Sequence, residues 1–92
     1  MALGIYFQTT MSPAQYDAVI SKLEDAGAGA PDGRAYHCAF AAGENNLHVF
    51  DVWNSEEQFA AFGETLMPIL ASEGVEAGQP DVSPIHRAIV GG

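Results

Sequence analysis

The chain of 92 residues carries a net charge of −9, has only three lysine and arginine residues, and is 48% hydrophobic. This length and hydrophobic content predict one folded domain over residues 1–92 and exclude a disordered chain. The scarcity of basic residues argues against nucleic acid and against anionic membranes as partners, because both are bound through lysine and arginine.

The first half of the chain predicts a strand, a helix and a second strand. Apolar residues alternate with small or polar ones over residues 3–8, which is the period of a half-buried strand. Residues 12–15 read Ser-Pro-Ala-Gln, a capping box with proline at the first helical position. The helix that follows is expected to bury an apolar stripe of Tyr16, Val19, Ile20 and Leu23. Gly27 then ends the helix, and after a loop a second strand is expected over residues 34–41.

The second half predicts a hairpin partner and a second helix. Residues 43–46 read Gly-Glu-Asn-Asn and predict a turn, and a third strand is expected over residues 47–53. Residues 55–58 read Ser-Glu-Glu-Gln and predict a second capping box. The stripe of this second helix is formed by Phe59, Phe62, Leu66, Ile69 and Leu70.

Two prolines bear on the shape of the second half. Pro68 lies within the helical pattern, where it removes a backbone donor, so a kink near Met67 or a break into two short helices is expected. The last strand is expected over residues 82–90. It contains Pro84, which cannot donate to a strand ladder and therefore favours an edge position.

The order β-α-β-β-α-β predicts the overall architecture. With right-handed crossovers it gives an α+β, ferredoxin-like fold, in which one four-stranded antiparallel sheet carries both helices on one face. The face without helices should then alternate to polar residues, but both faces of the second and third strands are largely apolar. We therefore expect a homodimer in which two sheets pack face to face.

The hairpin between the second and third strands brings together two ionisable residues. The turn sets a register in which His37 lies opposite Asp51 on one face, with Ala35 opposite Trp53 as the next pair. A carboxylate beside an imidazole favours the imidazolium and holds one tautomer. The pair is thus a candidate general base, or a group that polarises a bound phenol or carbonyl. The alternative is a structural pair in which the two side chains only satisfy each other.

The remaining histidines and the cysteine are weaker candidates for a functional site. His48 is expected on the face opposite Asp51, and His86 lies in the predicted last strand. Cys38 is the only cysteine, which excludes an internal disulfide, and its apolar neighbours predict an inert thiol. The histidines lack the short spacing of metal ligands, and no glycine-rich phosphate loop follows a strand, so we expect neither a metal nor a cofactor.

The segment VFDVWNSEEQFAAF resembles the dimeric α+β barrel superfamily and is most similar to antibiotic biosynthesis monooxygenase-like proteins. The resemblance rests on an apolar strand that ends in Trp53, a Ser-acidic-acidic helix start at Ser55 and the aromatic residue Phe59. It implies a dimeric barrel. It also implies cofactor-independent oxygenation, or isomerisation, of a small aromatic or quinol-like compound.

The resemblance also implies roles for individual residues. Trp53 would line a pocket between the sheet and the helices, where His37 and Asp51 would handle the substrate proton. The further candidates for substrate binding are Tyr6, Tyr36 and His86. The side chains expected to pack across the dimer are Tyr36, Phe40, Phe50 and Val52.

Two further readings follow from the same comparison. Haem-degrading relatives carry an asparagine in the first strand and a histidine in the second helix, whereas this chain has Tyr6 and Phe7 in the first and no histidine over residues 55–73. Haem degradation is therefore not expected. The alternative to an enzyme is a non-catalytic homodimer that binds a small ligand or serves in assembly.

The sequence predicts a cytoplasmic location. No apolar run approaches the roughly 18 residues of a membrane-spanning helix. The first ten residues have neither the basic start nor the small-residue cleavage site of a signal peptide.

Overall fold

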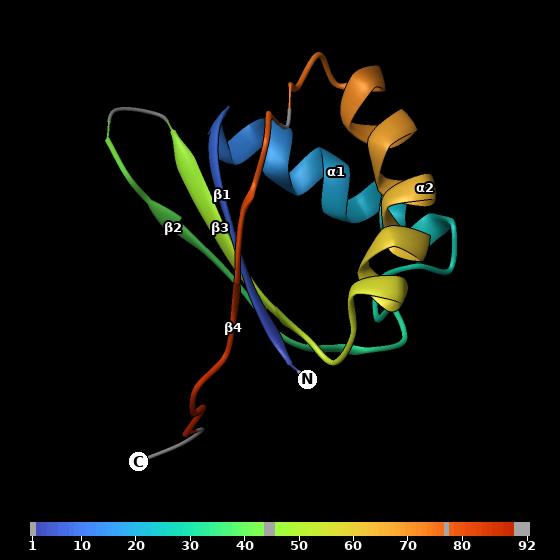
Figure 1. Cartoon of the computed structure of the whole chain (residues 1–92). Coiled ribbons are helices and arrows are strands. Elements are labelled where there is room, and N and C mark those ends of the chain that lie inside the picture. The colour runs from blue at the N-terminus through green and yellow to red at the C-terminus, as the bar shows by residue number, and fades with distance from the viewer. Residues whose placement is uncertain (1, 44–45, 77, 90–92) are drawn as a thin grey trace.

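The computed structural model describes residues 2–43, 46–76 and 78–89, and it contains the expected strands and helices in the expected order (Figure 1). They are β1 (Leu3–Met11), α1 (Pro13–Asp25), β2 (Arg34–Ala41), β3 (Leu47–Trp53), α2 (Glu56–Ser72) and β4 (Asp81–Pro84). The strands pair antiparallel in the order β2-β3-β1-β4. Figure 1 shows both helices on one face of this sheet. The predicted ferredoxin-like fold is confirmed.

The two helices begin at serine caps of different quality. At α1, the Ser12 hydroxyl accepts from the Gln15 backbone N–H at 3.1 Å, and the Gln15 side chain accepts from the Ser12 N–H at 2.9 Å. This is the complete, predicted capping box, with Pro13 in the first turn. At α2, Ser55 accepts from the Gln58 N–H at 3.2 Å, but its hydroxyl also donates to the Gln58 side-chain oxygen at 3.0 Å. The second capping box is therefore only half formed.

The last strand is shorter than predicted. β4 ends at Pro84 instead of running to residue 90, which lies outside the described residues. Pro84 pairs with Leu3 at the start of β1, and the Ile85 N–H donates to the Ala2 carbonyl at 2.9 Å. Beyond that point β1 offers no further residues for pairing, and the chain turns away from the sheet (Figure 1). The predicted edge position of Pro84 is confirmed.

The second helix is not broken at Pro68. α2 runs as one helix from Glu56 to Ser72 with this proline inside it. The apolar stripe is buried on both sides of the proline, at Phe62 and Leu70. This burial outweighs the loss of one backbone hydrogen bond.

The hairpin register agrees with the prediction at its functional pair. His37 lies opposite Asp51, so both project toward the helices. The predicted pairing of Ala35 with Trp53 is wrong, because an irregularity follows Arg34 and makes Arg34 the partner of Trp53. Ala35 is exposed as a result. Of the predicted turn, residues 44–45 lie outside the described part of the chain.

The core lies between the sheet and the helices. Trp53 and Ile5 are completely buried in it. Around them pack Met11, Val19, Leu23, Val49, Phe62, Leu70 and Val75. The other predicted stripe residues are partly buried against this core, namely Tyr16, Ile20, Phe59, Leu66 and Ile69. Both predicted apolar stripes are therefore confirmed.

The opposite face of the sheet is aromatic and open to solvent. The exposed fractions of Tyr36 and Phe40 are 46% and 41%. The Tyr6 ring stacks on Phe40 with 6.3 Å between centroids, and the His48 ring meets Phe40 edge-on. Val52, which was expected at a dimer interface, is already buried within the single chain.

Over the described residues, no helix has the length and apolar character needed to cross a membrane.

Candidate active site

The site is built on the His37–Asp51 pair of the central hairpin. Antiparallel pairing of β2 with β3 places the two side chains opposite each other on the helix-facing side. His37 Nδ1 lies 2.5 Å from Asp51 Oδ1. Asp51 is only 4% exposed, so its carboxylate depends on protein partners for its hydrogen bonds.

Two further residues extend this pair into a continuous chain of hydrogen bonds. The Tyr16 hydroxyl of α1 lies 2.7 Å from His37 Nε2, and the Trp53 Nε1–H donates to Asp51 Oδ2 at 3.2 Å. A carboxylate only accepts, so His37 Nδ1 carries a proton, and in the tautomer that leaves Nε2 unprotonated this nitrogen accepts from the Tyr16 hydroxyl. The order Tyr16, His37, Asp51, Trp53 thus links α1 to β2 and β3.

Tyr16 is a candidate site residue that the sequence analysis missed. It was assigned only to the apolar stripe of α1. Its hydroxyl is the one polar group in that stripe, and a buried tyrosine hydroxyl usually requires a partner. That property could have directed attention to the ionisable pair on the sheet below.

The surroundings of Tyr16 keep it protonated. Burial raises the pKa of its hydroxyl above the ordinary value of 10.0, and the nearby Asp51 adds to this increase. The Arg34 guanidinium opposes the shift by favouring the phenolate. Near neutral pH Tyr16 is therefore a neutral phenol that can donate one proton and accept another.

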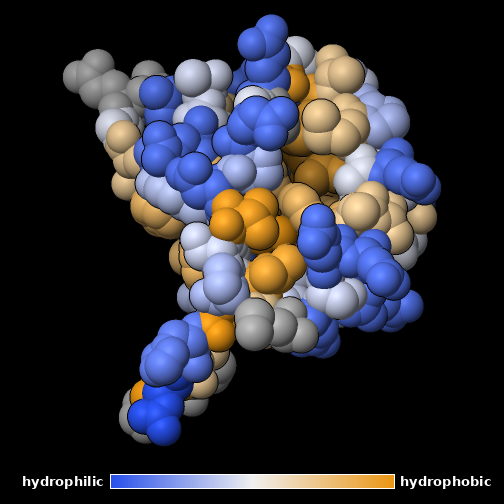
Figure 2. All heavy atoms as spheres, viewed as in Figure 1, coloured by the Kyte–Doolittle hydropathy of each residue, from blue (hydrophilic) through white to orange (hydrophobic). Residues whose placement is uncertain are grey.

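An apolar cavity adjoins these groups. It has a volume of about 60 Å³, and its polar lining is supplied by Thr9, Tyr16, Arg34, His37 and Asp51. The remaining lining includes Phe7, Met11, Val19, Ile20, Leu23, Val49, Phe62, Leu66, Leu70 and Val75. Figure 2 shows a hollow surrounded by hydrophobic residues where the sheet and the helices meet. For comparison, a cavity of about 150 Å³ binds benzene, so an aromatic ligand must widen this one.

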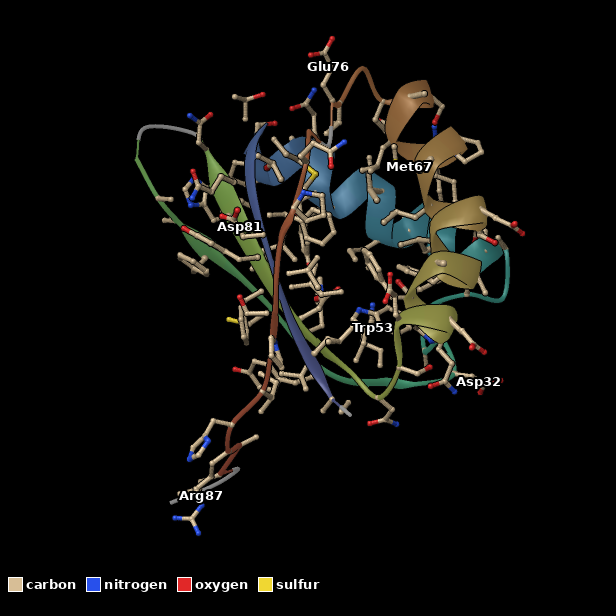
Figure 3. The ribbon with its side chains drawn as sticks, in the orientation of Figure 1. Asp32, Trp53, Met67, Glu76, Asp81 and Arg87 are labelled. Atoms are coloured by element: carbon tan, nitrogen blue, oxygen red, sulfur yellow. The ribbon has the colours of Figure 1, made fainter. Side chains whose placement is uncertain are left out.

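The structure separates the other candidate residues from this cavity. Trp53 lies between the sheet and α2 (Figure 3) and is not among the residues that line the cavity. It packs against Phe59 and Phe62 and donates to Asp51, so it contacts the lining residues Phe62 and Asp51 from behind. Tyr6 and Tyr36 point to the opposite face of the sheet, since they pair with Phe50 and Val52.

His86 does not lie in a strand, contrary to expectation. It is exposed on the segment that follows β4, next to Arg87, which Figure 3 shows far from Trp53. Within one chain, this histidine and the two tyrosines of the opposite face cannot reach a ligand in the cavity.

His48 has its own tyrosine partner on the opposite face, as its predicted orientation requires. The Tyr6 hydroxyl lies 2.6 Å from His48 Nδ1. Among the described residues, no carboxylate is hydrogen-bonded to the His48 ring. Nor do those residues bring three histidine, cysteine, aspartate or glutamate side chains together as a metal site would require.

Arg34 is the second cavity residue that the sequence did not reveal. The irregularity at the start of β2 places it opposite Trp53, and its guanidinium carbon lies 5.9 Å from the centroid of the Phe62 ring. Its Nη2 donates to the Gly29 carbonyl at 3.0 Å. A cation therefore borders a largely apolar cavity, whose lining also includes the Asp51 carboxyl group.

Comparison with known proteins establishes the fold. No protein-family model and no curated protein sequence matches the chain. A proposed antibiotic biosynthesis monooxygenase from Chloroflexus aurantiacus superimposes with a TM-score of 0.68 at 19% identity, over 99% of this chain and 100% of the other. SnoaB, a cofactor-independent oxygenase from Streptomyces nogalater, gives 0.62 at 14% identity, over 96% and 94% of the two chains.

A third solved structure contains a ligand. The ActVA-Orf6 monooxygenase of Streptomyces coelicolor, in complex with nanaomycin D, gives a TM-score of 0.59 at 14% identity, over 99% of this chain and 92% of the other. The chain thus matches structures of antibiotic biosynthesis monooxygenases over nearly its full length. At these identities the similarity establishes the shared fold, and the reaction must be argued from the site.

Proposed function

We propose that the protein is a cofactor-independent monooxygenase that oxidises a small, electron-rich aromatic compound such as a phenol or quinol. The observation that carries this proposal is the Tyr16–His37–Asp51 chain of hydrogen bonds at an apolar cavity. In this proposal the chain of hydrogen bonds would supply a proton acceptor beside a bound aromatic ring. Oxygenases of the same fold make the proposal more specific.

The proposed reaction needs no external reductant. A phenol with a hydrogen at its para carbon reacts with O₂ to give the para-quinone and water. One oxygen atom forms the new carbonyl, and the other leaves as water with the phenolic hydrogen and the ring hydrogen. The ring supplies all four electrons, so the protein has only to move protons and exclude solvent.

Tyr16 and His37 would move the first proton. Tyr16 lies between the cavity and His37 Nε2, so it can accept the phenolic proton while passing its own to the imidazole. Asp51 is bonded to the opposite nitrogen and would stabilise the resulting imidazolium. The substrate phenolate formed in this way is the electron-rich species that O₂ attacks. Reversal of the same path would supply a proton to the distal oxygen of the carbon-bound peroxide, so that the O–O bond breaks, this oxygen leaves as water and the proximal oxygen becomes the new carbonyl.

The test compares two histidines in matched surroundings. His37 and His48 each bond a tyrosine hydroxyl, but they lie on opposite faces of the sheet and only His37 has the carboxylate. Wild type, His37→Ala and His48→Ala would be screened by thermal shift with quinols, hydroxylated naphthalenes, anthrones, flavins and haem. Oxygen consumption would be followed for each compound that binds.

The expected result is a phenolic or quinol compound that stabilises the wild type and consumes oxygen with it. A ligand at a hundred times its Kd adds about 2.7 kcal/mol to the free energy of unfolding, which raises the melting temperature by several degrees. His37→Ala should abolish oxygen consumption, and His48→Ala should retain it. Equal loss in both variants, or binding without oxygen consumption, would contradict the oxygenase proposal.

A non-catalytic role is the second candidate, and one observation favours it. Both nitrogens of His37 and both oxygens of Asp51 already have partners within the chain. Such a satisfied network can be purely structural. In that case His37→Ala would lower the melting temperature without changing the response to any compound, and the protein would be a ligand-binding or assembly module.

We also propose that the working form is a homodimer joined through the aromatic face of the sheet. The support is the exposure of Tyr36 and Phe40 beside the stacked Tyr6, on a face that no helix of this chain covers. Large exposed aromatic groups in one patch are unusual on a monomer. A second copy would cover them with an identical surface.

A further inference from the structure

The few basic side chains of this acidic chain have different surroundings. Lys22 pairs with Glu73 and also donates to Ser72 at 2.8 Å, so it joins α1 to the end of α2. Arg87 is exposed on the segment after β4 (Figure 3). Arg34 is the basic residue at the cavity. In a chain with net charge −9, a positively charged side chain beside the cavity is unexpected.

Arg34 has no acidic partner in the described part of the chain. The ion pairs found there join Lys22 to Glu73 and His37 to Asp51. A guanidinium carries five N–H donors, and the described side-chain contacts of Arg34 are one hydrogen bond to the Gly29 carbonyl and the face of Phe62. Donors therefore remain for a ligand.

Two concave regions, the inner cavity and an outer groove, lie near Arg34. Phe62 lines the inner cavity and, on its other side, a shallow outer groove between residues 27–32 and the first turns of α2. The guanidinium covers the Phe62 ring and is bonded to the loop beside that groove. Because Phe62 belongs to both linings, movement of Phe62 and of the guanidinium over it is the proposed source of the extra volume that an aromatic ring needs.

We propose that Arg34 is a specificity residue that binds the carboxylate of an aromatic ligand whose ring occupies the widened cavity. This inference rests on the proposed aromatic site and adds a second recognition group to it. The ring would contact the apolar lining, its hydroxyl would meet Tyr16, and its carboxylate would lie at the boundary with the outer groove. Guanidinium and carboxylate match in shape and charge and can form two parallel hydrogen bonds.

The charge of the chain favours a single carboxylate over a phosphate group. The chain has twelve aspartate and glutamate residues and only three lysine and arginine residues, which gives it a net charge of −9. A ligand with two or more negative charges would be repelled by this field, and a single guanidinium would not compensate. A monocarboxylate adds only one negative charge beside Arg34, where Asp51 of the cavity and Asp32 of the outer groove already contribute acidic groups.

Binding of matched acids and esters tests this assignment. Isothermal titration calorimetry would measure Kd for 4-hydroxybenzoate and 6-hydroxy-2-naphthoate, and for their methyl esters, which keep the ring and hydroxyl but lack the charge. The proteins would be wild type, Arg34→Gln and Arg87→Gln, since the two variants change the net charge equally. Arg34→Lys would be added as a variant that keeps the positive charge but lacks the planar guanidinium and its two parallel hydrogen bonds.

We expect at least one acid to bind the wild type more tightly than its ester. Arg34→Gln should weaken this acid about tenfold or more while leaving the ester within about twofold, because only the acid loses a charge-assisted partner. Arg34→Lys should lie between the two, and Arg87→Gln should match the wild type. Intact melting curves of the Arg34 variants would show that the loss is not caused by unfolding.

Three results would overturn the assignment. They are equal weakening of the acid by Arg87→Gln, an unchanged acid affinity in Arg34→Gln, and no binding of either acid to the wild type. If the esters bind and Arg34→Gln has no effect, the aromatic site survives without this residue. If the acid binds through Arg34 but no phenol consumes oxygen, the oxygenase proposal fails and the recognition role remains.

Discussion

Two tyrosine–histidine pairs occupy opposite faces of the same sheet, and one residue makes them chemically different. On the helix side, Asp51 accepts from His37 at 2.5 Å and from Trp53 at 3.2 Å. On the open side, the imidazole of His48 bonds Tyr6 at 2.6 Å. The buried carboxylate fixes the tautomer of His37 and can stabilise its protonated form. Any proton transfer through His37 would therefore depend on Asp51 as well as on the imidazole itself.

The raised pKa of Tyr16 predicts how stability changes in alkali. The folded chain holds this proton more tightly than the unfolded chain, where the pKa is about 10. The contribution of Tyr16 is therefore complete below about pH 10 and is lost as the pH rises through the folded-state pKa. Tyr16→Phe lacks this titration, so its free energy of unfolding should fall less steeply above about pH 10 than that of the wild type.

Urea denaturation of both proteins at about pH 8 and about pH 11 measures this difference. The difference in tyrosinate absorbance between folded wild type and folded Tyr16→Phe would report the titration of Tyr16 among the three tyrosines. Parallel loss of stability in the two proteins would mean that burial does not hold the proton on Tyr16.

At the scale of elements, the junction before β2 positions Arg34. Gly33 has φ of +91°, a conformation that favours glycine, and its carbonyl accepts from the Asn54 N–H at 2.7 Å. This contact ties the loop to the end of β3. A Cβ at Gly33 would also lie only 2.7 Å from the Cβ of Gln58, in the first turn of α2.

Gly33→Ala should therefore destabilise the protein more than Gly27→Ala. Both positions have positive φ, but a Cβ at Gly27 would meet nothing within 4 Å. Gly27→Ala should cost about 1 kcal/mol from backbone strain alone. Gly33→Ala should cost about 2 to 3 kcal/mol, because Gln58 must also move and its N–H is bonded to Ser55. Denaturant midpoints give both values, and equal costs would show that Gln58 adjusts freely.

At the scale of the whole molecule, the two faces of the sheet differ in what covers them. The helices cover one face and enclose the site. On the other, Phe40 and Tyr36 remain about half exposed within a single chain. The hydrophobic effect favours covering such a surface, at roughly 25 cal/mol for each Å² of apolar area.

Phe40→Lys should convert the proposed homodimer to a monomer. The substitution places a charge in the centre of the aromatic face, where burial against a second copy would be costly. Met67→Lys is the matched control, since Met67 is 53% exposed on α2, away from that face. Sedimentation equilibrium should give a dimeric mass for the wild type and Met67→Lys and a monomeric mass for Phe40→Lys. A monomeric wild type would contradict the dimer.

The sequence by itself determined the types of the elements, their order, and the hairpin register at His37 and Asp51, though not the end of β4 or the pairing at the start of β2. Alternation, helical spacing and serine caps are local properties, readable within a few residues of each feature. The register of β2 against β3 follows from the short turn that joins them, and this is why His37 and Asp51 could be paired from the sequence alone.

Only the tertiary structure decided which residues complete the site. Tyr16 reaches His37 because α1 packs across the sheet, and Arg34 borders the cavity because β2 is irregular at its start. β4 stops at Pro84 because β1 offers no further partner. Each of these outcomes depends on packing between segments that are distant in the chain. Local periodicity carries no information about such contacts, so they can be read only from the packed tertiary structure.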